Sequence, residues 1–239
     1  MKRILFLLML LCLGPATASP DWMADRNILM DDIIKDRQVL RHVLGRDHLS
    51  PAVEQAMRRV PRHEYVPEDL RDVAYENRPL SIGYGQTISQ PLIVALMTDL
   101  LDVQAGDKVL ELGTGSGYQA AVLAELGVVV YSMEIVPPLG ERAQKVLQKQ
   151  HPDNVHLRIG DGYHGWEEAA PFDAIIVTAA GDHIPPPLVD QLKPGGRMVI
   201  PVGTHYFSQQ LLLVTKDDAG KVSTQSLLPV AFVPLTGEH

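Results

Sequence analysis

Three glycines in the middle of the chain mark the segment whose residue types could bind a ligand. They alternate in Glu111-Leu-Gly-Thr-Gly-Ser-Gly117, directly after the apolar residues Val109 and Leu110. A glycine backbone accepts positive φ angles and lets a ligand approach without a Cβ in the way. An alanine-rich helical pattern follows, and a helix start offers free N–H groups and a partial positive charge. The segment therefore predicts a strand, a tight turn and a helix that together form a nucleotide-type cofactor site.

The spacing of these glycines narrows the choice of cofactor. It reads G-x-G-x-G, which differs from the G-x-G-x-x-G of dinucleotide-binding folds, and the Lys-Ser/Thr pair of a P-loop does not follow. S-adenosylmethionine (SAM) suits such a loop, because it joins an amino acid to an adenosine and carries no phosphate. The residues that we expect to contact it here are Glu111, Gly113, Thr114, Gly115, Ser116 and Gly117.

Two further acids follow apolar segments downstream of the glycines. Glu134 ends the segment 128–134, about 20 residues beyond the first glycine, where a ribose-binding carboxylate belongs in a β-α-β unit. The competing interpretation is that Glu134 caps the next helix. Asp161 and Gly162 follow the segment 155–159 and could meet the adenine amino group, although an Asp-Gly turn is the simpler interpretation. Both acids are expected at the same sheet edge as the glycines.

Strand-like and helical patterns alternate along the second half of the chain. This alternation predicts an α/β fold of the Rossmann-like type, with a mostly parallel, doubly wound sheet whose ligand lies outside the carboxyl ends of the strands. A Pro-Gly-Gly turn is expected to feed the last parallel strand. The segments expected to form strands after the first one are 128–134, 155–159, 173–178, 192–202, 211–215 and 230–234.

The first part of the chain lacks such strand signals. Residues 22–45 read as one helix, and Ser50-Pro51 starts another, with Ser as the N-cap and Pro in the first turn. Residues 22–80 are therefore expected to form a helical prelude to a SAM-binding sheet at 81–239. Together they are expected to form a single domain, 19–239, which would be a methyltransferase domain if the bound SAM donates its methyl group.

Residues 1–18 resemble a signal peptide. Lys2 and Arg3 precede ten apolar residues, and a helix breaker and Ala16-Thr-Ala18 follow. The apolar run is too short for a permanent membrane-spanning helix. The competing interpretation is that translation begins at Met23 or Met30.

Composition excludes several classes of partner. The chain of 239 residues has a net charge of −8 and no Lys/Arg-rich tract, so we expect no nucleic-acid partner. It has one cysteine, Cys12, and its nine histidines lack metal-ligand spacing, so we expect neither a disulfide framework nor a metal. We also expect no stable membrane association, and a monomer.

Several motifs resemble those of the protein-L-isoaspartate (D-aspartate) O-methyltransferase family. The most specific is Gly85-Gln-Thr-Ile-Ser-Gln-Pro91, which general methyltransferases lack. The resemblance extends over about residues 50–236. The other shared segments are Val60-Pro-Arg-His-Glu-Tyr-Val-Pro67, the glycine-rich loop 109–118, Gly160-Asp-Gly162, Pro171-Phe-Asp-Ala-Ile-Ile-Val-Thr-Ala-Ala180 and Phe232-Val-Pro-Leu235.

This resemblance implies a SAM-dependent carboxyl methyltransferase of protein repair. Its substrate is the α-carboxylate of an L-isoaspartyl or D-aspartyl residue, which is already ionised at neutral pH and needs no catalytic base. It implies that Ser89 donates a hydrogen bond to that carboxylate, within a substrate segment of Thr87, Ile88, Ser89 and Gln90. A helix N-cap is the structural alternative for Ser89. Ala231 stands where bacterial members often carry an arginine, so a substrate contact there differs.

Other functions stay open at this point. The chain could methylate another carboxylate or a small molecule, or it could be a non-catalytic exported protein that keeps the fold. An NAD-dependent oxidoreductase is disfavoured by the glycine spacing. The compartment is also open: the signal-like residues 1–18 indicate the periplasm, whereas SAM supply and the family resemblance favour the cytoplasm, which we prefer.

Overall fold

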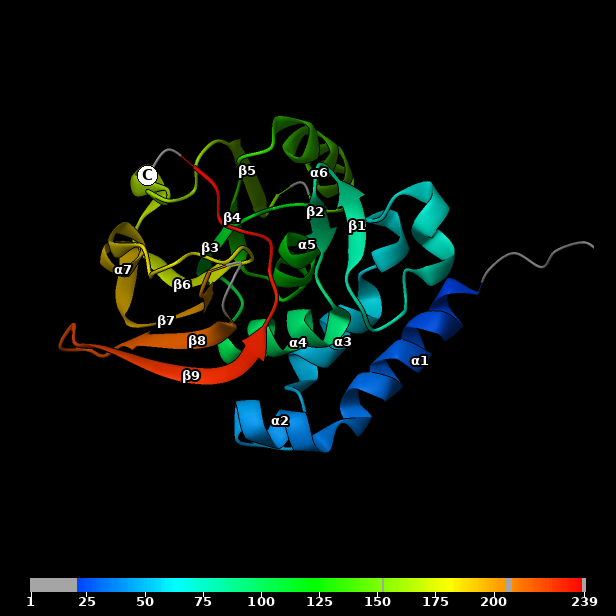
Figure 1. Cartoon of the computed structure of the whole chain (residues 1–239), viewed down its shortest axis with the longest axis horizontal. Helices are drawn as coiled ribbons and strands as arrows, with labels where there is room; N and C mark the ends of the chain where they lie inside the picture. The colour runs from blue at the N-terminus through cyan, green and yellow to red at the C-terminus, as the bar shows by residue number, and fades with distance from the viewer. Residues whose placement is uncertain (1–20, 152, 205–207, 238–239) are drawn as a thin grey trace, which may run out of the picture.

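The computed structural model describes residues 21–151, 153–204 and 208–237. The signal-like segment 1–18 lies outside these residues. Figure 1 shows a twisted sheet with helices on both of its faces and a helical layer beside it. The sheet has the order β5-β4-β3-β6-β7-β8-β9. Its strands are β3 (Lys108–Leu112), β4 (Val129–Glu134), β5 (Val155–Ile159), β6 (Phe172–Val177), β7 (Leu192–Val202), β8 (Gln209–Lys216) and β9 (Val222–Val230).

The strand directions confirm the expected doubly wound architecture. β3 to β7 run parallel, and β8 is antiparallel to both of its neighbours. The chain goes from β3 outward to β4 and β5, then returns to β6 on the other side of β3. In such sheets the ligand binds at the carboxyl ends of the strands where the winding reverses. The reversal here lies between β3 and β6.

The two faces of the sheet bury separate apolar clusters, because neighbouring side chains of a strand point to opposite faces. Val109 of β3 belongs to the larger cluster, and Leu110 belongs to the smaller one with Leu188 and Phe172. Strands covered on both faces are apolar throughout, which is why these strands could be read from the sequence. The helices that contribute to the larger cluster are α4 (Pro91–Leu100), α5 (Tyr118–Glu125) and α6 (Pro137–Gln150), and α7 (Pro186–Gln191) contributes to the smaller one.

The helical prelude differs from the expectation in one place. It contains two helices where one was expected, α1 (Trp22–Lys35) and α2 (Arg37–Leu44). Asp36 separates them, because its carboxylate accepts the N–H of Val39 and so caps α2. The helix expected after Ser50-Pro51 is confirmed as α3 (Pro51–Arg59), with the Ser50 side chain as its N-cap. The prelude also contains two 3₁₀ helices, η1 (Arg62–Glu64) and η2 (Glu68–Val73), and a third, η3 (Glu167–Ala169), precedes β6.

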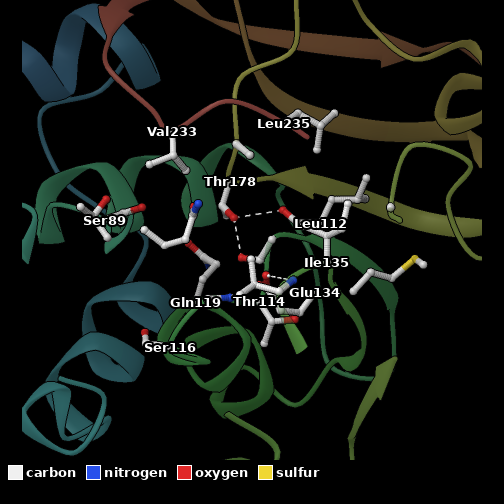
Figure 2. A pocket seen from close by; sticks show the side chains of 18 of the residues that line it. Ser89, Leu112, Thr114, Ser116, Gln119, Glu134, Ile135, Thr178, Val233 and Leu235 are labelled. Carbon is white, nitrogen blue, oxygen red and sulfur yellow. Dashed lines mark hydrogen bonds between the residues drawn. The ribbon is translucent and has the colours of Figure 1, made fainter. Parts of the chain in front are cut away.

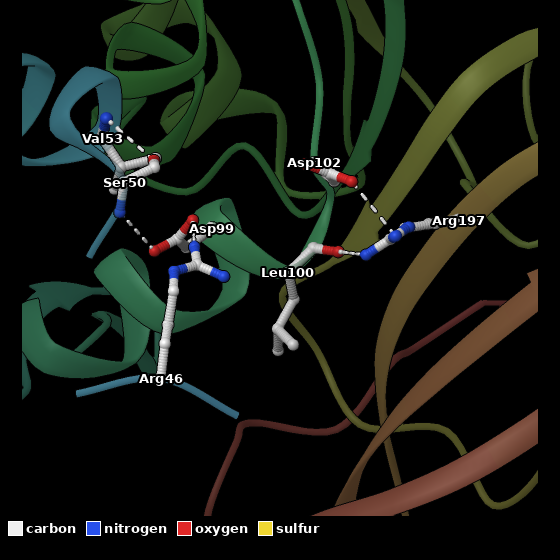
Figure 3. A network of polar contacts seen from close by, with 7 residues as sticks. All are labelled: Arg46, Ser50, Val53, Asp99, Leu100, Asp102 and Arg197. Atoms are coloured by element: carbon white, nitrogen blue, oxygen red, sulfur yellow. Dashed lines mark hydrogen bonds and ion pairs between the residues drawn. The ribbon is translucent and has the colours of Figure 1, made fainter. Parts of the chain in front are cut away.

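A buried carboxylate joins the prelude to the sheet layer (Figure 3). Asp99, near the end of α4, accepts the backbone N–H of Ser50 at 2.9 Å and pairs with Arg46 at 2.6 Å. On the other side, Arg197 of β7 donates to the carbonyl of Leu100 at 3.3 Å. The buried side chains of the prelude and of one sheet face belong to a single apolar cluster.

Three local expectations need correction. The Pro-Gly-Gly residues lie within β7, as an irregularity where its pairing with β6 jumps from Leu192 to Arg197. The strand expected at 230–234 is wrong, because β9 ends at Val230. A two-stranded antiparallel sheet was missed, β1 (Leu80–Gly83) with β2 (Gln86–Ile88).

Residues 231–235 cross the carboxyl ends of the sheet instead of forming a strand of it, as the red segment in Figure 1 shows. The N–H of Ala180 donates to the carbonyl of Val233, and the N–H of Leu235 donates back to the carbonyl of Ala180. Both distances are 2.8 Å. This crossing brings the end of the chain to the reversal point between β3 and β6.

Candidate active site

A pocket opens where the sheet reverses its winding (Figure 2). Its volume is about 770 Å³, a figure that includes the open solvent at its mouth. Its walls come from β2, α4, the glycine loop, the end of β4, the end of β6 and the crossing segment. The lining residues that the sequence had singled out are Thr87, Ile88, Ser89, Gly113, Thr114, Gly115, Ser116, Glu134 and Gly162.

The glycine loop owes its shape to a contact with the next strand. The Thr178 hydroxyl, just after β6, donates to the carbonyl oxygens of Gly113 at 2.7 Å and Leu112 at 3.0 Å. A Cβ on Gly113 would lie 2.5 Å from that hydroxyl oxygen, and the φ of Gly113 is +95°. A side chain at this position would therefore both strain the backbone and displace Thr178.

Glu134 lines the pocket beside the glycine loop. Its side chain is buried, and its two carboxylate oxygens accept the N–H groups of Gly115 at 2.7 Å and Val136 at 2.9 Å. Val136 is the N-cap residue of α6, so Glu134 supports the start of that helix as well as the glycine loop. A carboxylate offers about four lone-pair positions, so two remain for a pair of hydroxyl groups.

Glu111 lies one layer behind the pocket and is not among its lining residues. It is fully buried, and it accepts the Ser132 hydroxyl at 2.5 Å, which in turn lies 2.6 Å from the Thr114 hydroxyl. Its other oxygen has no hydrogen-bond partner among the described residues. Burial, reinforced by the charge of Glu134, raises the pKa of Glu111 to about 8. Glu111 is therefore mostly protonated at pH 7. Hydrogen bonds through Ser132 connect it to Thr114, which lines the pocket.

Two other predicted cofactor residues also lie outside the pocket lining. Gly117 is the N-cap residue of α5, in the left-handed conformation. Asp161 accepts the N–H of Tyr163 at 2.9 Å and so forms the turn that was its simpler interpretation. The sequence alone could not distinguish residues such as these, which shape the pocket, from residues whose atoms line it.

A second cavity joins the first. It measures about 1,060 Å³ including open solvent, and it includes the remaining substrate residue, Gln90. The four residues common to both cavities are Thr87, Ser89, Thr178 and Val233. The other residues around the second cavity are Pro79, Ile93, Pro229, Val230, Ala231 and Phe232.

Ser89 lies at the junction of the two cavities and is not a helix cap. The N-cap residue of α4 is Gln90, and the N–H of Leu92 donates to the side chain of Asn77 at 3.1 Å. Within the described part of the chain, the Ser89 hydroxyl has no hydrogen-bond partner and is free to donate. The start of α4 offers a bound carboxylate few backbone N–H groups, because Pro91 has none and that of Leu92 is occupied.

Several lining residues were not found by sequence reasoning. Thr178 follows β6 directly, and the rule that ligands bind at strand ends could have identified it. Gln119, in the first turn of α5, donates to the Thr98 hydroxyl at 2.9 Å and had no recognisable signal. Residues 233–236 line the pocket only because the chain crosses back over the sheet.

The lining fits the adenosyl and amino-acid parts of SAM. Glu134 is its one charged residue, and it contains no lysine, arginine or histidine with which to bind a phosphate. Ile88, Met133, Ile135 and Leu235 provide apolar surface for a flat ring. Among the described residues there is no cluster of histidine, cysteine or acidic side chains suited to a metal ion. No helix in this part of the chain is long and apolar enough to cross a membrane.

Comparison with known proteins identifies close relatives. A protein-L-isoaspartate O-methyltransferase 2 of Syntrophobacter fumaroxidans is 56% identical over 238 residues, covering 99% of this chain and 96% of its own. One of Polaromonas sp. is 60% identical over 211 residues, covering 88% of this chain and all of its own. The first alignment therefore includes nearly all of the N-terminal segment, and the second covers a shorter part of the chain.

Solved structures show the same similarity. A protein-L-isoaspartate O-methyltransferase superposes with a TM-score of 0.76 at 29% identity, over 89% of this chain and 66% of the other, which is just under two thirds. A Plasmodium falciparum protein assigned to the same activity, solved with S-adenosyl-L-homocysteine, gives 0.73 at 26% identity, over 91% and 99%. The profile of the protein-L-isoaspartate (D-aspartate) O-methyltransferase family matches residues 35–239. The chain therefore belongs to this family of SAM-dependent methyltransferases.

Proposed function

We propose that the two joined cavities transfer the methyl group of SAM to the α-carboxylate of isoaspartyl and D-aspartyl residues in damaged proteins, the step that starts their repair. The observation that carries this proposal is the position of Ser89, whose free hydroxyl lies where the pocket suited to SAM meets a second, open cavity. A binding site for a protein substrate has to be open, because the reacting residue is part of a long chain.

The cofactor side of the proposal assigns a role to each pocket residue. Glu134 would accept the two ribose hydroxyls with its remaining lone pairs, and Gly113 and Gly115 would allow the ligand to approach the loop. Thr114, Ser116 and Gly162 complete the proposed contacts, while Glu111, Gly117 and Asp161 would support them from behind. When bound, SAM supplies a methyl group on a positively charged sulfur.

The substrate side needs positioning more than acid–base chemistry. A carboxylate with a pKa near 4 is already a nucleophile at neutral pH, so no residue has to remove a proton. Ser89 would donate a hydrogen bond to it, and Thr87 and Ile88 would line its approach. Val233 and Leu235 of the crossing segment cover the pocket and would keep water from the reacting atoms.

The reaction moves one methyl group from sulfur to a carboxylate oxygen. The sulfur keeps the electron pair of the broken bond, and the product is a methyl ester. Without help from the protein, the amide nitrogen of the isoaspartyl linkage then attacks the ester carbonyl, methanol leaves and a succinimide forms. Water reopens this ring, partly as normal aspartate.

A direct assay tests the proposal. The protein should transfer label from SAM to a peptide that contains isoaspartate and leave the same peptide with aspartate unlabelled. A free small-molecule acid, assayed alongside, represents the alternative substrate class. Equal labelling of the two peptides, or labelling of the small acid alone, would contradict the proposal.

Domain organisation, oligomeric state and location belong to the same proposal. We place the chain in the cytoplasm, where SAM is made, as a monomer with one methyltransferase domain, because prelude and sheet share one apolar cluster. Sedimentation measures the oligomeric state. The N-terminal residue of the native protein tests the location, because Met1 or Met23 agrees with the cytoplasm and Ser19 with export to the periplasm.

A further inference from the structure

We propose that Asn77 is a positioning residue that holds Ser89 in place for the incoming carboxylate. The inference rests on the role proposed above for Ser89. Asn77 lies in the link between η2 and β1, and it contacts the first turn of α4 through two different groups. No sequence motif considered above includes it.

The first turn of α4 has no cap of its own. Gln90 occupies the N-cap position, but its side chain makes no capping hydrogen bond. Pro91 follows and has no N–H, so the first helical N–H belongs to Leu92. That N–H donates to the side-chain oxygen of Asn77 at 3.1 Å, which makes Asn77 the cap of a helix far along the chain.

A second hydrogen bond holds the residue directly after Ser89. The side-chain amide of Gln90 donates to the backbone carbonyl of Asn77 at 3.1 Å. Asn77 therefore holds Gln90 and Leu92, on either side of Pro91. Ser89 itself lies between the end of β2 and the start of α4, outside the hydrogen-bond pattern of either element. Its position depends on how firmly these two neighbours are held.

The link that carries Asn77 is itself anchored by a buried arginine. Arg62 is fully buried, and its guanidinium donates to the carbonyl of Ala74 at 2.9 Å and to that of Arg78 at 3.5 Å. The same group lies 4.9 Å from the ring centre of Tyr118, which lines the cofactor pocket. Arg62 therefore contacts both the link that carries Asn77 and Tyr118, the first residue of α5. One buried side chain thus supports the walls of both cavities.

The test is a double-mutant cycle between Asn77 and Ser89. We expect Asn77→Ala to lower kcat/KM for an isoaspartyl peptide about 10-fold, in keeping with the loss of alignment at one hydrogen bond. The Kd for SAM should stay within about 2-fold, because Asn77 does not line that pocket. In a Ser89→Ala background the Asn77→Ala change should have almost no further effect, because the two residues act through one contact.

Two further variants separate positioning from stability. Asn77→Asp keeps an acceptor for the N–H of Leu92 and should restore most of the activity. Asn154→Ala is the matched control, because the Asn154 side chain likewise joins segments far apart in the chain, by donating to the carbonyls of Ala124 and Val128, but it lies far from Ser89 in the sequence and lines neither cavity. It should lower the thermal midpoint and leave kcat/KM unchanged. If Asn77→Ala does not fold, Asn77→Gln, which displaces the acceptor, takes its place in the cycle.

The outcomes distinguish this inference from the proposed function. If Ser89→Ala keeps full activity, the role of Ser89 is wrong and the inference fails with it. If Ser89→Ala is impaired but the Asn77 change is silent, or adds its full effect in the double mutant, Asn77 does not act through Ser89. An equal loss of kcat/KM in Asn154→Ala would also overturn the inference, because general destabilisation would then explain it.

Discussion

At the scale of single residues, the unusual group is the buried acid Glu111. Its neighbours are a serine hydroxyl and the carboxylate of Glu134, with no cation among the described residues to balance a charge. Taking an ionised carboxylate out of water is unfavourable, so the group keeps its proton. A neutral acid at this point can hold Ser132 and Thr114 in place without repelling Glu134.

The proton on Glu111 leads to a pH-dependent prediction. Its pKa rises from 4.5 to about 8 on folding, so between these values the folded protein holds a proton that the unfolded chain releases. Stability therefore decreases as pH rises through this window, by at most about 1.4 kcal/mol per pH unit. Glu111→Gln removes this loss, so it should raise the thermal midpoint at pH 8 by several degrees and change it little at pH 5. An identical shift at both pH values would show that Glu111 is ionised in the folded protein.

A second residue-scale prediction concerns Ser89. A hydrogen bond to a charged group is worth about 1.5–3 kcal/mol, so Ser89→Ala should lower kcat/KM for an isoaspartyl peptide about 10- to 150-fold. Because Asn77 and not Ser89 caps α4, the thermal midpoint should stay the same. Calorimetry and kinetics on one preparation measure both quantities. A destabilised variant with normal kinetics would reverse the assignment.

At the scale of elements, the crossing segment 231–235 forms part of the walls of both cavities. It leaves the sheet edge at the end of β9 and covers the carboxyl ends of the strands, so Ala231, Phe232 and Val233 line the second cavity. None of the residues around that cavity carries a charge. A substrate side chain that occupied this cavity next to the damaged aspartate would therefore meet an uncharged environment.

This environment predicts a preference in the substrate. Peptides with leucine beside the isoaspartate should have a kcat/KM about 10-fold higher than peptides with glutamate there, because the cavity offers the charged side chain no partner. Ala231→Arg should reduce or reverse the preference by supplying a cation. The measurement is a matched peptide pair with each enzyme. Equal rates for both peptides with the unmodified protein would place the neighbouring side chain outside the cavity.

At the scale of the whole molecule, the prelude and the sheet are held together by a large apolar cluster and by the contacts of Asp99. This carboxylate is 3% exposed and accepts from both Arg46 and Ser50. Asp99→Ala leaves those two donors without their acceptor, so it should lower the free energy of unfolding by about 1–3 kcal/mol. The Kd for SAM should not change, since α4 contacts the pocket at its other end. Denaturant unfolding with a SAM titration tests both parts, and weaker SAM binding would contradict the separation.

Much of the architecture could be predicted because the inner strands of the sheet are buried on both faces. Apolar runs located β3 to β7 closely, and the acid and glycines at their ends indicated the correct edge of the sheet. β9 was missed because it is an edge strand of mostly exposed, polar residues such as Ser223 and Thr224. An edge strand is held by its pairing with β8, and that pairing leaves no apolar pattern in the sequence.

The roles of individual site residues depended on the tertiary structure. Residue type and spacing predicted that a glycine loop and an acid form a cofactor site, and the family motif pointed to Ser89. They could not determine that Glu111 lies behind the loop while Glu134 faces the pocket, or that Asn77 caps α4. Those outcomes depend on contacts between segments far apart in the chain, such as the link before β1 and the start of α4, which meet only when the sheet and its helices have packed. The sequence alone determines local periodicity and turns, whereas burial and long-range hydrogen bonds exist only in the folded molecule.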